Sequence, residues 1–293
     1  MRVFVTGATG FIGTAVVREL IDAGHQVTGL ARSDAAAKSL AAAGAGVHRG
    51  SLSEFESLRS GAAAADGVIH IAFTIDFLNY GRAAEEDRLA IETLGGALVG
   101  SDRPFIVTSA IGPAQRQGSL TTEEDAANPN SPRKSEEAAL ALEARGVRTS
   151  VLRLAPSVHD NGDHGFVQRL IGIAREKGVS AFIGDGLQRW SAVHRLDAAQ
   201  LYRLALEKGS VAARYHGVAD QGVPTGEIAE VIGRHLNLPV ISKSREEAAA
   251  HFGWIAMFFG RDSAASSALT QARVGWRPVQ PGLIANLKAG NYF

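Results

Sequence analysis

Short apolar runs and amphipathic stretches alternate along the first half of the chain, up to about residue 155. The first apolar run, Arg2–Val5, is rich in β-prone residues, and the stretch Thr14–Ala23 after it carries apolar residues at helical spacing. Such alternation is typical of a parallel sheet, because each parallel strand needs a crossover helix to return the chain. We therefore predict an α/β fold of Rossmann type, a doubly wound parallel sheet with helices on both faces.

The pattern also gives approximate bounds for the elements. The predicted strands cover residues 2–5, 25–32, 46–50, 67–73, 103–110 and 149–155. The predicted helices cover residues 14–23, 34–44, 53–65, 83–99 and 133–146. Ser53, with Glu56 three residues later, predicts a capping box at the start of one of these helices.

Beyond residue 156 the alternation loosens. Helices are predicted over residues 164–178, 195–209 and 224–237, a short strand over 180–186, and a last helix after a Gly-Trp-x-Pro turn. Asp197 is the expected N-cap of the second of these helices. We predict two domains, a Rossmann domain over residues 1–156 and a smaller substrate lobe over residues 157–293 that is interleaved with the sheet.

The 293 residues carry 30 basic and 30 acidic side chains, so the formal net charge is zero. A chain without a basic face is a poor partner for a polyanion, and we expect no nucleic-acid partner. The absence of cysteine excludes disulfides and thiolate nucleophiles. The most apolar late stretch, Phe252–Gly260, is far too short to cross a bilayer, and no signal segment is recognisable. A cytoplasmic protein with no membrane partner is expected.

The turn between the first strand and the first helix carries Gly7, Gly10 and Gly13. Gly7 allows a tight turn, Gly10 lets the backbone approach a pyrophosphate, and Gly13 lets the helix pack closely against the strand. The free N–H groups at the helix start would face the anion. The spacing Gly-x-x-Gly-x-x-Gly matches the general dinucleotide pattern Gly-x-Gly-x-x-Gly only loosely. We interpret the turn as a dinucleotide phosphate site; the alternative is a glycine-rich turn that binds nothing.

The end of the second strand bears on the choice between NAD and NADP. An NAD site usually has an acidic residue here, which binds the ribose hydroxyls. In this chain the strand ends with Arg32 and Ser33, and a guanidinium binds phosphate through paired donors. The sequence therefore predicts NADP(H) rather than NAD as the cofactor. In the alternative, Arg32 is a surface charge and Asp34 binds the ribose of NAD.

The string Thr6–Gly13 resembles the cofactor turn of the extended and atypical short-chain dehydrogenases/reductases, a superfamily that includes the NAD-dependent nucleotide-sugar epimerases and dehydratases. The resemblance implies that the residues after the third strand lie near the adenine. It also implies that the backbone after the fourth strand runs beside the cofactor ribose, and that the loop after the sixth strand contacts the nicotinamide. Besides the three glycines, Arg32 and Ser33, the cofactor-binding residues implied are Thr9, Phe11, Ile12, Ser51, Leu52, Ala72, Phe73, Arg133 and Pro156.

The catalytic residues of that family are only partly present. The family has a serine after strand five that binds the substrate oxygen, and Ser109 matches it. It also has a Tyr-x-x-x-Lys pair on the next helix, but no tyrosine of this chain has lysine four residues on. Matching SPRKSEEAALAL to the family helix places Arg133 at the lysine and Pro129 at the tyrosine. A shift by one residue places Lys134 and Asn130 there instead.

The proton donor must therefore be another residue. Arg133 can hold the cofactor ribose or polarise an oxygen, but a guanidinium does not deprotonate in proteins. Ligands of open α/β sheets bind at the carboxyl ends of the strands. His159, after the sixth strand, is the first candidate because histidine titrates near neutral pH, and Tyr80, after the fourth, is the second. In the alternative, both are ordinary loop residues.

Two further groups of residues admit a chemical interpretation. His159, Asp160, Asp163 and His164 could be metal ligands, but the family needs no metal and we expect none. His70, in the fourth strand, is expected to be a packed strand residue rather than a catalyst.

Three functions fit these features. The first is an NADP(H)-dependent oxidoreductase that reduces a small carbonyl compound or a related polarised double bond, with Ser109 and Arg133 in its site. The second is a catalytically silent NADP(H)-binding sensor or regulator, which the missing tyrosine favours. The third is a nucleotide-sugar epimerase or dehydratase. The expected partner is a small-molecule substrate. A homodimer packed through helix 133–145 is a family expectation, although the apolar stripe of that helix could equally be monomer core.

Overall fold

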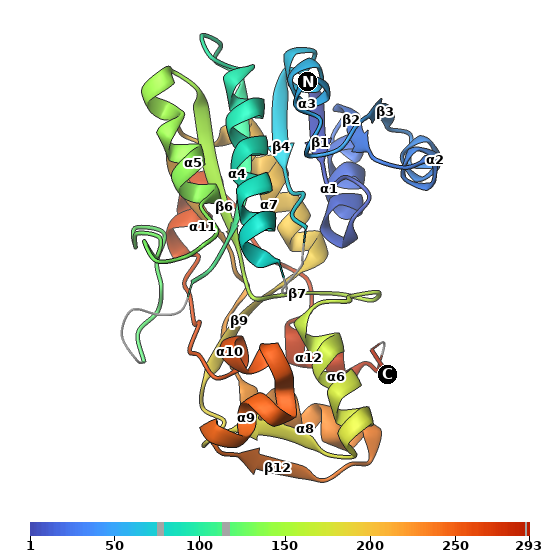
Figure 1. Cartoon of the computed structure of the whole chain (residues 1–293), viewed down its shortest axis with the longest axis vertical. Coiled ribbons are helices and arrows are strands. Elements are labelled where there is room, and N and C mark those ends of the chain that lie inside the picture. Colours follow the sequence, from blue (N-terminus) through green and yellow to red (C-terminus); the bar gives the residue numbers. More distant parts are fainter. Residues whose placement is uncertain (75–78, 113–117, 291) are drawn as a thin grey trace.

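A parallel sheet with the strand order β10-β6-β5-β4-β1-β2-β3 forms the centre of the larger body of the protein (Figure 1). The computed structural model describes residues 1–74, 79–112, 118–290 and 292–293. All strand pairs in this sheet are parallel, which confirms the predicted Rossmann-type α/β fold. The strands are β1 (Arg2–Thr6), β2 (Gln26–Ala31), β3 (Gly46–Arg49), β4 (Gly67–His70), β5 (Pro104–Ala110), β6 (Arg148–Leu154) and β10 (Ala213–Gly217).

Helices cover both faces of this sheet. On one face lie α1 (Phe11–Asp22), α2 (Asp34–Ala42) and α7 (Arg195–Lys208). On the other face lie α3 (Phe55–Ala63), α4 (Tyr80–Gly96) and α5 (Ser135–Ala141). Strand β1 contributes to both cores, because successive side chains of a strand point to opposite faces. Val3 and Val5 pack in the first core and Phe4 in the second.

A second, smaller body has its own core around the buried side chains of Trp190, Phe252 and Phe259. In Figure 1 it lies below the large sheet, beyond the ends of the sheet's strands. Its strands form the sheets β11-β9-β7 and β12-β8. They are β7 (Ser157–His159), β8 (Ser180–Ile183), β9 (Arg189–His194), β11 (Asp220–Pro224) and β12 (Val240–Lys243). The helices packed with them are α6 (Phe166–Lys177), α8 (Thr225–Leu236), α9 (Arg245–Phe252), α10 (Ala256–Phe259) and α12 (Leu283–Lys288).

Segments from beyond residue 156 also belong to the larger body. Strand β10 pairs with β6 at the edge of the large sheet, and α7 packs against α1. Helix α11 (Ala268–Val274) packs on β10, and Trp276 after it is fully buried in the first core. The division at residue 156 stays a prediction, and the structure adds that the chain returns to the sheet after crossing into the smaller body.

Two predicted helix caps are wrong. Helix α3 begins after Glu54 with no side-chain cap, and the hydroxyl of Ser53 lies 3.1 Å from that of Ser51 instead. Helix α7 is capped by His194, whose Nδ1 accepts a hydrogen bond from the backbone N–H of Leu196. The carboxylate of Asp197 is buried and accepts backbone N–H groups of residues 279 and 280, each at 3.0 Å. Ser53 and Asp197 thus form hydrogen bonds with loop or distant residues instead of capping helices, and the local sequence pattern does not reveal these partners.

The predicted helix over 133–146 is shorter than expected. It consists of α5 and a single 3₁₀ turn, Glu143–Arg145, after which Gly146 adopts a left-handed conformation. Its apolar residues Ala138, Ala139 and Leu142 pack in the second core of the large sheet. The apolar stripe of this helix therefore forms part of the monomer core, which was the alternative interpretation. A homodimer packed through this helix stays a prediction.

The most apolar late stretch folds inside the smaller body. Residues 252–260 form the end of α9, a 3₁₀ turn over Gly253–Ile255, and α10. Ile255 and Phe259 are buried there in the core of the smaller body. Among the helices of the described ranges, none combines the length and the apolar character needed to traverse a membrane.

Candidate functional site

The glycine turn between β1 and α1 leaves no room for side chains. Gly7 has a φ of +70°, and a Cβ atom there would lie 2.7 Å from the backbone nitrogen of Ala72. A Cβ atom on Gly13 would lie 1.9 Å from the carbonyl oxygen of Gly7. The N–H of Gly10 donates to that same carbonyl at 3.0 Å. Only glycine at positions 7 and 13 allows the strand, the turn and the helix to approach this closely.

The start of α1 is open to an anion. Gly10 is its N-cap in an extended conformation, no side chain caps the helix, and its first turn contains no acidic residue. Thr9 and Gly10 are exposed, whereas Phe11 and Ile12 are partly buried. The first N–H groups of a helix have no intrahelical partner and carry a partial positive charge. The turn therefore fits the pyrophosphate of a dinucleotide.

The three residues after β2 differ in whether their side chains have a hydrogen-bond partner. Arg32 is exposed and makes no hydrogen bond or ion pair with any described residue. The hydroxyl of Ser33 caps α2 by accepting the N–H of Ala36 at 3.2 Å. The carboxylate of Asp34 accepts a hydrogen bond from Arg49 at 2.6 Å. Arg32 thus remains available for a ligand, while the acidic neighbour already has a cationic partner.

The two residues predicted to lie near the adenine are partly buried and carry no charge. Ser51 and Leu52 follow β3 and are both partly buried. The side chain of Leu52 packs against the second core of the large sheet. Neither position supplies the acidic group that the family often has there.

A chain of buried polar groups begins directly before the glycine turn. The hydroxyl of Thr6 lies 2.7 Å from Nδ1 of His70, and Nε2 of His70 lies 3.2 Å from Oδ1 of Asp87. All three residues are at most 1% exposed. His70 is therefore packed in the strand as predicted, and it also connects the turn to a buried carboxylate on α4.

Arg133 lies at the carboxyl ends of β4 and β5. Its guanidinium carbon is 4.0 Å from the centre of the Phe73 ring, a cation–π distance. Its Nε donates to the hydroxyl of Ser135 at 2.7 Å, and one amine donates to the carbonyl of Thr108 at 3.0 Å. Nε is also 3.6 Å from a carboxylate oxygen of Asp87.

Lys134 points elsewhere. Its ammonium group donates to the carbonyl of Pro129 at 2.8 Å and pairs with Glu137 at 3.0 Å. Pro129 and Asn130 are exposed, and Asn130 belongs to a turn in which its N–H donates to the side chain of Asn128. The structure therefore brings Arg133, and not Lys134, to Phe73 at the ends of the sheet strands.

Tyr80 and Ser109 lie at the same edge of the sheet. Tyr80 begins α4, is partly buried, and has its ring centre 5.7 Å from that of Phe73. Burial raises the pKa of its phenol, and the nearby charge of Arg133 partly offsets this effect. Ser109 is a partly buried residue near the end of β5, opposite Arg153 of β6. Its hydroxyl makes no hydrogen bond with the residues that the structure describes.

The structure argues against His159 as the proton donor. The residue lies in β7, is 0% exposed, and neither ring nitrogen has a hydrogen-bond partner within the described ranges. Burial and the adjacent His194, whose ring centre is 5.4 Å away, lower its pKa to about 3. A histidine with this pKa carries no acidic proton to give near neutral pH. Pro156, directly before β7, is partly buried.

The four residues considered as metal ligands face different partners. Asp160 pairs with Arg195 at 2.9 Å and lies 3.3 Å from His194. Asp163 accepts a hydrogen bond from the hydroxyl of Tyr292, and the ring of His164 lies against Phe11 with 5.8 Å between ring centres. Within the described ranges, no three His, Asp or Glu side chains are grouped so that they could hold a metal ion.

Several buried residues at the site were given no role of their own in the sequence-based predictions. They are Thr6, Asp87, Thr108, Ser135 and Tyr202. The hydroxyl of Thr108 donates to the carbonyl of His70 and lies 2.7 Å from the hydroxyl of Tyr202. Asp87 has a recognisable signal, because it stands among the buried α4 residues Ala83, Ala90, Ile91 and Leu94 at helical spacing.

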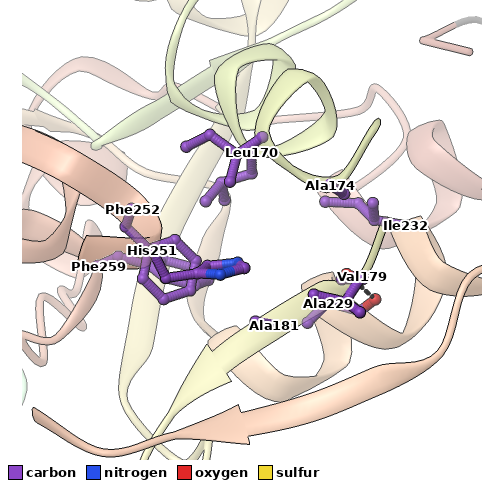
Figure 2. A pocket seen from close by; sticks show the side chains of 11 residues that line it. Leu170, Ala174, Val179, Ala181, Ala229, Ile232, His251, Phe252 and Phe259 are labelled. Atoms are coloured by element: carbon purple, nitrogen blue, oxygen red, sulfur yellow. Dashed lines mark hydrogen bonds between the residues drawn. The ribbon is translucent and has the colours of Figure 1, made fainter. Parts of the chain in front are cut away.

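A small recess elsewhere belongs to the core of the smaller body. Figure 2 shows Leu170, Phe252 and Phe259 around it, with the imidazole of His251 at one side. Its volume is about 10 Å³, enough for about one water molecule. The recess is lined mainly by apolar residues and is not part of the site at the glycine turn.

Comparisons with known proteins agree with this geometry. The model of the NAD dependent epimerase/dehydratase family matches residues 3–216. The chain is 48% identical to an uncharacterized protein of Schizosaccharomyces pombe over 100% of both chains. It is 26% identical to 2-alkyl-3-oxoalkanoate reductase of Stenotrophomonas maltophilia, over 83% of this chain and 78% of that protein.

The fold is also similar to that of solved structures. One is the UDP-glucose 4-epimerase of Thermotoga maritima, with a TM-score of 0.77 and 21% identity over 99% of this chain and 97% of that one. The match to the family model covers most of the chain, from β1 to β10. This protein therefore belongs to the NAD-dependent epimerase/dehydratase family, a group of Rossmann-fold short-chain dehydrogenases/reductases.

Proposed function

We propose that this protein is an NADP(H)-dependent oxidoreductase that reduces a small carbonyl compound or a related polarised double bond. The proposal rests on one observation: a glycine turn with an uncapped helix start, which fits an anion, and a cation, Arg133, lie at the carboxyl edge of the same sheet. The similarity to a 2-alkyl-3-oxoalkanoate reductase supports a reductase among the chemistries of this family.

NADP(H) is proposed as the cofactor. The glycine turn and the start of α1 would hold its pyrophosphate. Arg32 is exposed and without a partner among the described residues, so it can bind a 2′-phosphate through paired donors. The bond between Asp34 and Arg49 disfavours the alternative in which Asp34 holds the ribose of NAD.

The side chains at the sheet edge have separate roles in this proposal. The cofactor, when bound, supplies the hydride. Ser109 donates a hydrogen bond to the substrate oxygen as charge develops on it. Arg133 binds the cofactor ribose or the same oxygen through its guanidinium. Tyr80 gives its phenolic proton to that oxygen, and it replaces His159 as the proposed donor because it holds its proton at neutral pH.

The test is consumption of NADPH by the purified protein with a panel of aldehydes, ketones and 3-oxo acids. Turnover of at least one compound is expected, with Ser109→Ala and Arg133→Ala each slowing it at least about tenfold. Lys134→Ala is the matched control, because its ammonium group faces Pro129 and Glu137. Unchanged turnover in the first two variants would remove these residues from the mechanism.

A catalytically silent NADP(H)-binding sensor or regulator is the second candidate. The observation that favours it is the exposed turn at Pro129 and Asn130, where the family has its tyrosine. It predicts tight NADP(H) binding, no turnover with any compound, and a partner protein whose affinity depends on the oxidation state of the cofactor. One demonstrated turnover by the pure protein would exclude it.

A nucleotide-sugar epimerase or dehydratase is the third candidate. The fold similarity to a UDP-glucose 4-epimerase favours it, so UDP-glucose belongs in the panel. Formation of an epimer or a dehydrated sugar would support this function over the reductase.

A further inference from the structure

Asp87 is a buried carboxylate in α4 whose oxygens are both engaged. The residue is 1% exposed, and a buried charge is tolerated only when it is paired and hydrogen-bonded. Nε2 of His70 lies 3.2 Å from its Oδ1. The hydroxyl of Ser135 donates a short hydrogen bond to its Oδ2, and Nε of Arg133 lies 3.6 Å from the same oxygen. The carboxylate therefore joins groups from β4, from α5 and from the segment before α5.

His70 is held on its other side. The N–H of Ala72 donates to the hydroxyl oxygen of Thr6 at 3.4 Å, and that hydroxyl lies 2.7 Å from Nδ1 of His70. These contacts are satisfied together if the hydroxyl of Thr6 donates to Nδ1 and the Nε2–H of His70 donates to Asp87. The orientation of Asp87 is thus tied to the residue that precedes Gly7.

Arg133 donates only some of its N–H groups to the surrounding protein. Nε donates to Ser135, one amine donates to the carbonyl of Thr108, and the guanidinium carbon lies over the ring of Phe73. No described residue accepts a hydrogen bond from its Nη1 amine. This amine is available for a ligand, while the rest of the guanidinium is held in place.

The negative charge of Asp87 and the positive charge of Arg133 stabilise their close approach. Burial alone would raise the pKa of Asp87, but the hydrogen bond from His70 and the charge of Arg133 more than offset it, so the pKa lies below its usual value. The carboxylate is therefore ionised at neutral pH. An arginine without such a partner loses more side-chain entropy when it binds a ligand, because its long side chain samples many rotamers.

We infer that Asp87, oriented by His70 and Ser135, is a positioning residue that holds Arg133 against Phe73 with its Nη1 amine free for a bound ligand. The inference rests on the proposed function, in which Arg133 binds the cofactor ribose or the substrate oxygen. It assigns Asp87 an effect on ligand binding that passes through Arg133.

A double-mutant cycle on NADPH binding tests this inference. The full-length protein is compared with Asp87→Asn, Arg133→Ala and the double variant, and the Kd is measured from the fluorescence of NADPH. Asn keeps the shape of the side chain and an oxygen for His70 but removes the charge. Each single variant is expected to raise the Kd roughly tenfold, the range of a lost charge-assisted hydrogen bond. The double variant is expected to bind like Arg133→Ala alone, because Asp87 then has nothing to position.

The outcomes separate the inference from the proposed function. An unchanged Kd in Asp87→Asn, or effects of Asp87→Asn and Arg133→Ala that multiply in the double variant, overturns the inference alone. Wild-type protein that binds no NADPH overturns both proposals. Lys134→Ala should leave the Kd unchanged and controls for the loss of a neighbouring positive charge.

A second variant covers the case in which Asp87→Asn does not fold. Ser135→Ala removes the hydroxyl that joins Arg133 to Asp87 and leaves the carboxylate in place. The same cycle with Arg133→Ala is expected to show the same lack of additivity. Independent, multiplying effects of Ser135→Ala and Arg133→Ala would overturn the inference.

Discussion

The guanidinium carbon of Arg133 lies 4.0 Å from the centre of the Phe73 ring. Phe73 follows β4 and Arg133 comes before α5, so this cation–π contact joins two separate crossover segments of the sheet. The ring of Tyr80 also lies against Phe73, with 5.7 Å between the two ring centres. A cation, an aromatic ring and a phenol therefore form one cluster beside the carboxyl ends of β4 and β5.

Replacing Tyr80 by phenylalanine should slow turnover without weakening cofactor binding. Loss of a positioned proton donor costs about a hundredfold in rate or more. We therefore expect Tyr80→Phe to lower kcat about a hundredfold while the Kd of NADPH stays the same. Steady-state kinetics and NADPH fluorescence measure the two quantities.

His159→Leu is the contrasting variant for this experiment. The buried ring has no exposed atoms and a pKa of about 3, so its removal should leave kcat at neutral pH within about twofold. The reverse result, normal kcat in Tyr80→Phe and a large loss in His159→Leu, would restore His159 as the donor.

Arg32→Ala should reduce the preference for NADP over NAD. Charge-assisted hydrogen bonds to a phosphate contribute about 1.5–3 kcal/mol, so the Kd of NADPH should rise about ten- to a hundredfold. The Kd of NADH should change little, because it lacks the phosphate. Lys38→Ala is the control, because Lys38 is an exposed cation on the neighbouring helix α2 that makes no hydrogen bond or ion pair with any described residue. Equal losses of affinity for both cofactors in Arg32→Ala would contradict the assignment.

Gly13→Ala should destabilise the fold at the glycine turn. Its Cβ atom would lie 1.9 Å from the carbonyl oxygen of Gly7, a backbone atom that cannot move without separating α1 from β1. We expect a loss of about 3 kcal/mol in the free energy of unfolding, measured by urea denaturation. Gly172→Ala in the middle of α6 is the control, because nothing lies within 4 Å of its Cβ atom. It should gain about 0.5–1 kcal/mol, and a similar loss in both variants would count against the packing argument.

The free energy of unfolding should decrease as the pH is lowered below about 6.5, the ordinary pKa of histidine in an unfolded chain. Burial and the nearby His194 lower the pKa of His159 to about 3 in the folded protein. The unfolded chain therefore binds the proton first as the pH falls. The free energy of unfolding then drops by about 1.4 kcal/mol per pH unit for such a group.

His159→Leu should reduce this slope between about pH 6 and pH 4. Part of the slope should remain, because burial also lowers the pKa of His216, to about 4. Urea denaturation at several pH values measures the effect. Parallel curves for the wild-type protein and the variant would show that His159 does not carry the predicted linkage.

The buried strands of the large sheet and the helices between them were predictable from the sequence. Strands β1, β4 and β5 are largely apolar runs, and their neighbouring helices carry one apolar face, so periodicity locates both. The glycines at positions 7 and 13 were predictable too, because a close backbone approach tolerates no Cβ atom. Strands such as β10 and β12 lack this pattern, since their side chains are mixed in character and partly exposed.

Some features of the site were likewise predictable from the sequence, and others were not. The sequence by itself determines a glycine turn before a helix, a serine near the end of β5 and the loss of the Tyr-x-x-x-Lys pair. The sequence also places Asp87 at helical spacing among apolar residues of α4, but its burial is seen only in the structure. It does not determine what that carboxylate contacts, because His70 and Ser135 are 17 and 48 residues away along the chain.

Only the tertiary structure determined that Arg133, and not Lys134, meets the ring of Phe73, and that His159 is fully buried whereas Tyr80 is partly exposed. Adjacent residues on one segment have the same local propensity, but one cation meets the ring of Phe73 and the other meets the carbonyl of Pro129. His159 has the right chemistry in sequence but loses it through burial. Local periodicity determines which faces are buried, whereas the charge and direction of a side chain depend on distant groups that only the folded chain brings into contact.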